Sequence, residues 1–138
     1  MDTNQNASQN EDNKSSQGPL IVIVEDDKFL SNMYTAKFSL EGLNVLTATD
    51  GEEGLRIILE KKPKLILLDM MLPKITGQEV LTRLRKDPWG KDANVIALTN
   101  LAKKEEAKKA LELGAKEYLV KAMYTPEEVV EKIKSHLS

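Results

Sequence analysis

The sequence of 138 residues predicts one α/β domain, in which a five-stranded parallel sheet lies between two layers of helices. Three observations predict this fold. Short apolar runs alternate five times with segments of helical periodicity from Pro19 onward. The runs are apolar throughout, which is typical of parallel strands buried on both faces. The chain is long enough for one sizeable core and too short for two ordinary domains.

The first two strands are predicted at Leu20–Val24 and Asn44–Ala48. The helix after the first strand has apolar residues at i, i+3, i+4 and i+8, namely Leu30, Met33, Tyr34 and Phe38. Gly42 ends that helix as the residue after its C-cap. Asp50 stands three residues before Glu53, the spacing of a capping box, and therefore begins the second helix. The inner face of the second helix carries Leu55, Ile58 and Leu59.

The third strand is predicted at Leu65–Leu68 and delivers Asp69 to its carboxyl end. Thr76 then caps a third helix, because Glu79 follows it by three residues. The inner face of this helix carries Val80, Leu81 and Leu84. The helix ends at Asp87, since the residue before a proline is driven out of the helical region.

The fourth strand, Val95–Leu98, leads to Thr99, and the fifth, Glu117–Val120, leads to Lys121. The fourth helix, Lys103 to Leu113, lies between these strands and has a narrow inner face of Ala107, Ala110 and Leu111. Gly114 stops it. A capping box with proline at the first helical position begins the last helix. Its inner face carries Val129, Val130, Ile133 and Leu137.

Right-handed crossovers leave few topologies for five such units, and the flavodoxin-like, doubly wound strand order 2-1-3-4-5 is the one we expect. This order places the first and third strands side by side. Ligands bind such sheets at the carboxyl ends of the strands, where the strand order reverses. The acidic run Glu25-Asp26-Asp27 should therefore meet Asp69 and Lys121 in one crevice.

Composition limits the classes of function. The net charge of −2 and the pI near 5.5 do not favour nucleic-acid binding by this chain alone. The absence of cysteine excludes disulfides and thiol chemistry and suits a reducing cytoplasm. No signal peptide or membrane-spanning segment is recognisable, so we expect a cytoplasmic protein without a membrane partner. Residues 1–18, rich in Asn, Gln, Ser and Asp, are predicted to be a disordered tail ahead of a domain at residues 19–138.

The predicted crevice has the composition of a metal and phosphoryl site. Converging carboxylates repel one another unless a cation is present. An oxygen-only ligand set selects a hard cation, Mg²⁺ or Mn²⁺, and Mg²⁺ is commonly held by one or two carboxylates together with phosphate oxygens. The alternative is that Glu25-Asp26-Asp27 only caps the first helix, where the helix dipole favours negative charge. That alternative does not account for Asp69 and Lys121 at two other strand ends.

Four segments, "LIVIVEDD", "LILLDMMLPKITG", "VIALTN" and "YLVKA", occur in this order. They closely resemble the receiver domain of two-component response regulators over about residues 19–137. The resemblance implies a Mg²⁺ or Mn²⁺ site, whose ligands would be Asp26 directly, Glu25 largely through water, Asp69, and the backbone carbonyl of Met71. Asp69 would accept the phosphoryl group, and Thr99 and Lys121 would bind it. Tyr118 occupies the family's aromatic switch position.

The chain departs from the family pattern at three positions. Ala122 stands where the family has a proline after the lysine, so the Lys121–Ala122 peptide is either trans, with a different loop, or an unfavourable cis non-proline bond. Asn100 stands where a small residue is usual. Thr76 stands where an aspartate often precedes the glycine, and it serves as a helix cap.

The resemblance implies a stand-alone receiver, since the chain ends with the fifth helix. A histidine kinase or histidine phosphotransfer protein would phosphorylate Asp69. The output would be a downstream protein bound through the fourth helix, fifth strand and fifth helix. Apolar Met71 and Leu101 predict slow loss of the phosphoryl group, and His136 is expected to be a solvated helix end.

Two other functions remain open at this point. The first is a pseudo-receiver that acts as a scaffold without phosphorylation, which Ala122 and Asn100 would suit. The second is a phosphohydrolase with an aspartyl nucleophile. Haloacid-dehalogenase-like phosphatases carry a general-acid aspartate two residues after the nucleophile, and Met71 occupies that position here. We therefore expect the chain not to be an enzyme toward external substrates.

Overall fold

The computed structural model describes residues 18–100 and 103–137. The predicted disordered tail, apart from Gly18, and Leu101 lie outside the described residues. The strands are β1 (Leu20–Val24), β2 (Asn44–Ala48), β3 (Leu65–Asp69), β4 (Val95–Thr99) and β5 (Glu117–Val120). All neighbouring strands pair in parallel, in the order β2-β1-β3-β4-β5. The predicted fold class and strand order are confirmed.

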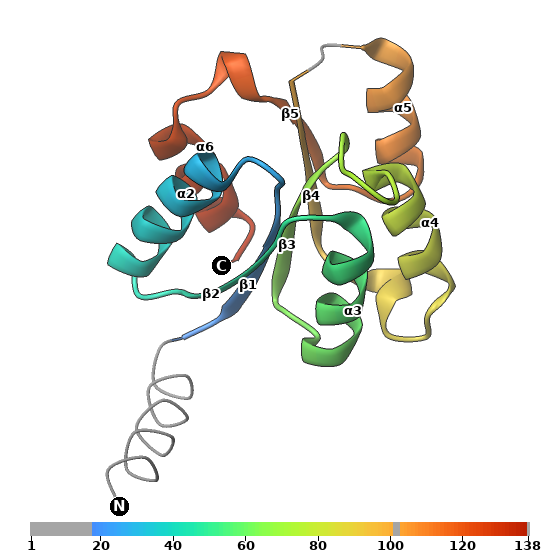
Figure 1. Ribbon diagram of the computed structural model, residues 1–138, viewed down its shortest axis with the longest axis horizontal. Coiled ribbons are helices and arrows are strands. Elements are labelled where there is room, and N and C mark those ends of the chain that lie inside the picture. Colours follow the sequence, from blue (N-terminus) through green and yellow to red (C-terminus); the bar gives the residue numbers. More distant parts are fainter. Residues whose placement is uncertain (1–17, 101–102, 138) are drawn as a thin grey trace, which may run out of the picture.

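Helices cover both faces of the sheet. They are α2 (Lys28–Leu40), α3 (Gly51–Lys61), α4 (Gly77–Lys86), α5 (Lys104–Glu112) and α6 (Pro126–Ser135), with short 3-10 turns η1 (Gly90–Asp92) and η2 (Lys121–Met123). Helices α2 and α6 pack on one face, whereas α3, α4 and α5 pack on the other (Figure 1). The carboxyl ends of the strands lie at the top of this view, where the loops to the following helices begin.

Each face of the sheet has its own core. Large side chains fill the face toward α2 and α6, among them Tyr34, Phe38, Ile96 and Ile133. The face toward α3, α4 and α5 contains Ile58, Val80, Leu81 and Leu84, together with the small Ala97 and Ala110. Strands β1, β3 and β4, which are buried along nearly their whole length, therefore supply side chains to both cores, as parallel strands covered on two sides must.

The predicted helix starts are correct. Asp50, Thr76 and Thr125 each accept a hydrogen bond from the backbone N–H three residues later. Thr125 also forms the full capping box with Glu128. Gly42, with φ of 82°, follows α2 in the left-handed conformation that a glycine adopts without strain.

One prediction about the inner face of α5 is wrong. Ala110 is fully buried, but Leu111 is 49% exposed. Successive residues on a helix are turned about 100° from each other, so a face as narrow as that of α5 admits only one of the two. The smaller side chain is the one directed at the sheet, and α5 consequently buries little apolar surface.

Candidate functional site

Three carboxylates meet at the carboxyl ends of β1 and β3. Glu25 follows β1 and Asp69 ends β3, and these side chains are 1% and 3% exposed. Asp26 is exposed. Glu25, Asp26 and Asp69 each direct one carboxylate oxygen into a group whose members lie within 4.8 Å of one another. The adjacency of β1 and β3 thus brings together residues 44 positions apart in the chain, as the predicted strand order requires.

The residues of the acidic run Glu25-Asp26-Asp27 have two different structural roles. The Asp27 side chain caps α2, accepting a hydrogen bond of 3.2 Å from the Leu30 backbone N–H. The backbone N–H of Asp27 donates to Glu25 Oε2 at 3.0 Å. Capping therefore explains Asp27 but leaves Glu25 and Asp26 to the carboxylate cluster.

Lys121 joins the cluster from the end of β5. Its Nζ lies 2.6 Å from Glu25 Oε1 and donates to Asp69 Oδ2 at 2.8 Å. Burial lowers the pKa of the Lys121 ammonium, but the hydrogen bonds and charges of Asp69 and Glu25 raise it more, so the net shift is upward. Lys121 is thus a permanent cation inside the site.

The surroundings of Glu25, one of the three carboxylates, disfavour its charged form. Burial raises the pKa of its carboxyl to about 7, and Asp69 adds to this, although Lys121 and the Asp27 N–H act in the opposite direction. Its Oε1 forms a close ion pair with Lys121 Nζ and accepts no other hydrogen bond from the described residues. The sequence predicted that Glu25 and Lys121 share one crevice, and the structure shows that they form a direct ion pair.

Asp69 is held from two sides. Its Oδ1 accepts a hydrogen bond of 2.9 Å from the Met71 backbone N–H, while Oδ2 faces Lys121. The Gly77 N–H donates to the Met70 carbonyl at 3.1 Å, and a Cβ on Gly77 would lie 2.5 Å from the Asp69 carbonyl oxygen. Glycine at this position therefore lets α4 begin directly against the segment that carries Asp69.

Thr99 and Tyr118 lie beside the cluster on β4 and β5. Thr99 is fully buried at the end of β4. The Tyr118 hydroxyl donates to Glu106 of α5 over a long 3.5 Å. Burial raises the pKa of the Tyr118 phenol, and Glu106 adds to this, whereas a hydrogen bond with Thr99 lowers it. Tyr118 therefore links the end of β4 to α5.

The three departures from the family pattern have plain structural outcomes. No peptide bond in residues 18–100 and 103–137 is cis, so the Lys121–Ala122 bond is trans, and the chain there forms η2. Asn100 is exposed after β4. Thr76 caps α4, as predicted. Met71 directs an exposed side chain away from the core.

His136 is not the solvated residue that was expected. Its Nε2 lies 2.5 Å from Glu117 Oε2, and Lys132 lies 3.2 Å from the other oxygen of that carboxylate. Glu117 belongs to β5, 19 residues earlier. The partner could not be recognised along the sequence because only the packing of α6 against β5 brings it near.

The donor set fits a hard divalent cation. Glu25, Asp26 and Asp69 contribute only oxygen ligands, and two of them, Glu25 and Asp69, are buried. One ammonium, Lys121, does not balance three carboxylates. A cation at this position would offset the remaining negative charge.

A buried aspartate, an acidic pair and a lysine thus meet at the switch point of a flavodoxin-like sheet. Residues 21–134 match the response regulator receiver domain, and the chain belongs to this family. Relatives include the DNA-binding dual master transcriptional regulator RpaA of Synechocystis, 34% identical over 86% of this chain and 49% of its own length. Another is the phosphate regulon regulator PhoB of Pseudomonas aeruginosa, 33% identical over 87% of this chain and 52% of its own length. The chain thus spans about half the length of these relatives.

Solved structures show the same fold. A CheY-like receiver domain protein of Methanospirillum hungatei is 31% identical, with a TM-score of 0.79 over 86% of this chain and 93% of that one. The Mn²⁺-bound form of the response regulator Rcp1 is 26% identical, with a TM-score of 0.76 over 86% of this chain and 93% of that one. Within the described residues, no helix is long and apolar enough to cross a membrane.

Proposed function

We propose that this receiver domain accepts a phosphoryl group on Asp69 and that the modification controls binding of a partner protein. The observation that carries the proposal is the position of Asp69, buried at a strand end between the Lys121 ammonium and the Met71 backbone N–H. A carboxylate in this position is held in place for attack on a phosphorus atom. Its two acidic neighbours and Lys121 supply the charges that phosphoryl transfer requires.

The chemistry of the step follows from these groups. An Asp69 carboxylate oxygen forms the new bond to phosphorus, while the bond between phosphorus and the donor's imidazole nitrogen breaks and the imidazole takes a proton. Lys121 then pairs with a phosphoryl oxygen, and the Thr99 hydroxyl hydrogen-bonds to another. Lysine suits an oxygen that arrives and leaves, because it is a mobile point charge rather than a rigid fork.

We further propose Mg²⁺ or Mn²⁺ as the cofactor. Asp26, Glu25 and Asp69 would hold it with the Met71 carbonyl, and when bound it would neutralise charge on the transferring phosphoryl group. The carboxylate cluster supports this assignment. The Mn²⁺-bound form of the similar response regulator Rcp1 supports it as well.

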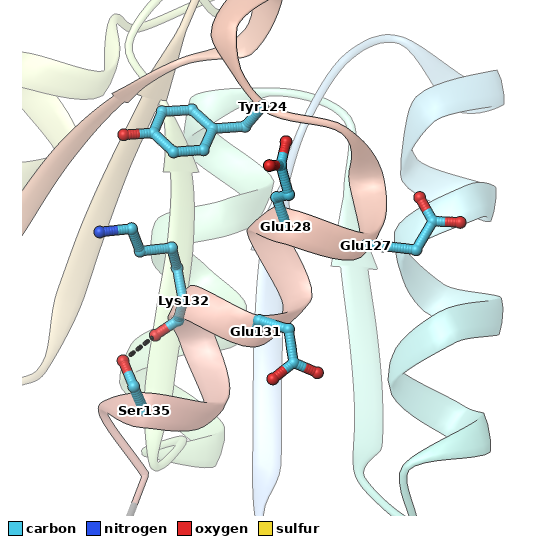
Figure 2. Close-up of a pocket in the computed structure, with 6 residues that line it drawn as sticks. All are labelled: Tyr124, Glu127, Glu128, Glu131, Lys132 and Ser135. Carbon is cyan, nitrogen blue, oxygen red and sulfur yellow. Dashed lines mark hydrogen bonds between the residues drawn. The ribbon is translucent and has the colours of Figure 1, made fainter.

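The phosphoryl donor would be a histidine kinase or a histidine phosphotransfer protein, as the family membership implies. We propose that a downstream protein binds the face formed by α5, β5 and α6. A hollow of about 400 Å³ lies along α6 and is lined by Tyr124, Glu128 and Lys132, among others. Figure 2 shows the Tyr124 ring above the side chain of Lys132 at one side of α6. Tyr118 connects the site to α5 in the same region.

In this function the chain would be a switch and not an enzyme toward external substrates. The chain would catalyse only its own phosphorylation and dephosphorylation. The side chain of Met71 carries no acid that could protonate a leaving group. The stand-alone role, the cytoplasmic location and the slow loss of the phosphoryl group stay predictions.

The test is phosphorylation by acetyl phosphate with Mg²⁺, followed by intact-mass measurement. The wild type should gain one phosphoryl group, and Asp69→Asn should gain none. Asp27→Asn is the matched control, because Asp27 is an adjacent carboxylate that serves as a helix cap. An unmodified wild type would favour the scaffold function, and continuous release of phosphate from added phosphomonoesters would favour the phosphohydrolase.

The metal has its own test in thermal or denaturant unfolding. Mg²⁺ binds the folded cluster and not the unfolded chain, so at about 100 times its Kd it should add about 2.7 kcal/mol to the free energy of unfolding. Asp26→Asn should remove most of that gain. A wild type whose unfolding does not depend on Mg²⁺ contradicts the metal assignment.

A further inference from the structure

Arg85, in the last turn of α4, makes four hydrogen bonds to backbone carbonyls. Its Nε donates to the Leu113 oxygen at 2.6 Å. Its Nη1 donates to the oxygens of Gly90 and Ala93 at 2.8 and 2.9 Å, and its Nη2 donates to Gly114 at 3.2 Å. All four acceptors are main-chain atoms, so the guanidinium holds backbone segments together rather than pairing with a carboxylate.

The segments that Arg85 holds lead into the two strands, β4 and β5, that carry Thr99 and Tyr118. Gly90 and Ala93 lie just before β4, which carries Thr99 at its far end. Leu113 and Gly114 end α5 and lie just before β5, which carries Tyr118. One side chain of α4 therefore fixes the entrances to two strands and the C-terminal end of a helix.

Charge also favours this position for a cation. The end of α5 is the negative end of the helix dipole, which a cation stabilises. Burial lowers the pKa of the Arg85 guanidinium, and the charge of Asp92 partly offsets this. Arginine remains charged throughout, and its rigid fork reaches several carbonyls at once, which a lysine cannot do.

The other end of α4 contacts the site itself. The helix begins at Gly77, whose N–H donates to the Met70 carbonyl and whose Cα lies close against the Asp69 backbone. The helix is ten residues long, or about 15 Å at 1.5 Å per residue. It thus forms one rigid connection from the Asp69 segment to Arg85.

Helix α5 has few other attachments. Ala110 is its buried residue, and Lys103 at its N-cap makes no side-chain capping bond. Toward its N-terminal half, Glu106 accepts the long hydrogen bond from Tyr118. Two of the four Arg85 bonds, those to the Leu113 and Gly114 carbonyls, therefore anchor the C-terminal end of α5.

We propose that Arg85 is a positioning residue of the switch, which fixes the C-terminal end of α5 and couples it through α4 to the state of Asp69. This inference rests on the proposed phosphorylation of Asp69. A shift of the Asp69 segment moves the N-terminus of α4, and Arg85 passes the shift to Leu113 and Gly114. This route is separate from the one through Thr99 and Tyr118, which reaches the other half of α5.

The test is hydrogen exchange measured by mass spectrometry, with and without acetyl phosphate and Mg²⁺, on wild type, Arg85→Lys and Arg83→Lys. Arg83 is the matched control, because it lies on the same helix, is exposed and, within the described part of the chain, forms an ion pair only with Glu79. Without phosphorylation, Arg85→Lys should speed exchange at the amides of residues 113–116 about tenfold, because several charge-assisted hydrogen bonds are lost. Arg83→Lys should leave it unchanged.

Phosphorylation separates positioning from mere stability. In wild type and Arg83→Lys it should change exchange at residues 113–116, whereas in Arg85→Lys this change should be absent although Asp69 is still modified. An equal change in Arg85→Lys, or no change in the phosphorylated wild type, overturns the proposal. If Arg85→Lys does not fold, unchanged exchange at residues 113–116 in the phosphorylated wild type still overturns the proposal. If the wild type gains no phosphoryl group, the proposed function itself is overturned. The anchoring role of Arg85 is overturned separately if unphosphorylated Arg85→Lys and wild type exchange at the same rate at residues 113–116.

Discussion

Helices α5 and α6 flank the edge strand β5, yet they are held in opposite ways. Helix α6 buries Val129, Val130 and Ile133 and begins with a complete capping box. Helix α5 buries Ala110 and begins at Lys103 without a side-chain cap. Each fully buried branched side chain contributes about 1.5–3 kcal/mol, so the difference in burial alone amounts to several kcal/mol.

The contrast shows where the receiver can change shape. Helices that bury little apolar surface open most easily, and moving parts of proteins come from this low-stability end. Helix α5 has this property and is also the helix that Tyr118 and Arg85 contact. Helix α6, by comparison, is firmly packed on the sheet, and the ion pair of Lys37 with Glu127 joins it to α2. The four predictions below test this contrast, from the largest expected effect to the smallest.

Truncation of a buried side chain of α6 should cause the largest loss of stability. Ile133→Ala removes a fully buried side chain from the core toward α2 and should lower the free energy of unfolding by about 2–5 kcal/mol. The matched change in α5, Leu111→Ala, should stay within about 0.5 kcal/mol because Leu111 is half-exposed. Urea unfolding followed by circular dichroism measures both, and equal losses would contradict the contrast.

Overfilling the thin face of α5 should come next. Ala110→Leu places three extra carbon atoms in a fully packed position and should cost about 1–3 kcal/mol. Hydrogen exchange should show that the loss is concentrated in α5, since this helix can lift away while the others stay packed. Ala107→Leu, at a half-buried position of the same helix, is the control and should cost less. Equal loosening of α5 and α6 would count against an independently weak α5.

An exchange of helix caps should reduce the difference between the two helices. Thr125→Ala removes the capping box of α6 and should cost about 0.5–2 kcal/mol. Lys103→Ser places a capping hydroxyl three residues before Glu106. The new cap should raise the free energy of opening the first turn of α5 by a similar amount and so slow amide exchange there. If Lys103→Ser has no effect on that exchange, the missing cap is not what weakens α5.

The smallest effect concerns pH and the attachment of α6 to β5. Burial raises the pKa of Glu117, but its contacts with His136 and Lys132 lower it more, so the net pKa lies below the ordinary 4.5. A carboxylate with a lowered pKa stabilises the fold above its ordinary pKa, and this contribution is lost as the pH falls through the folded-state value. Glu117→Gln should therefore destabilise the protein at pH 7 by less than about 1 kcal/mol. The gap between wild type and variant, measured by urea unfolding, should close as the pH falls below the ordinary 4.5 and through the folded-state pKa. A constant gap would argue against a charge effect.

Much of the molecule was predictable from local signals in the chain. Continuous apolar runs predicted the five strands, because parallel strands are buried on both faces. Caps such as Thr76 and Thr125 predicted the helix starts, because a capping hydrogen bond joins residues three positions apart. The strand order then placed Glu25 and Asp26 beside Asp69, since the handedness of crossovers leaves little choice. The fold and the membership of the carboxylate cluster thus follow from sequence alone.

Other features depended on contacts between distant residues. The pairing of Lys121 with Glu25, the partner of His136, the exposure of Leu111 and the four bonds of Arg85 have no local pattern. Arg85 reaches Leu113 across 28 positions, and in sequence it is one of several basic residues at the end of α4. Sequence by itself determined which residues form the elements and which carboxylates meet. Tertiary structure alone decided which charged side chains pair and which helix is weakly held, because those outcomes depend on the distances and burial that packing creates.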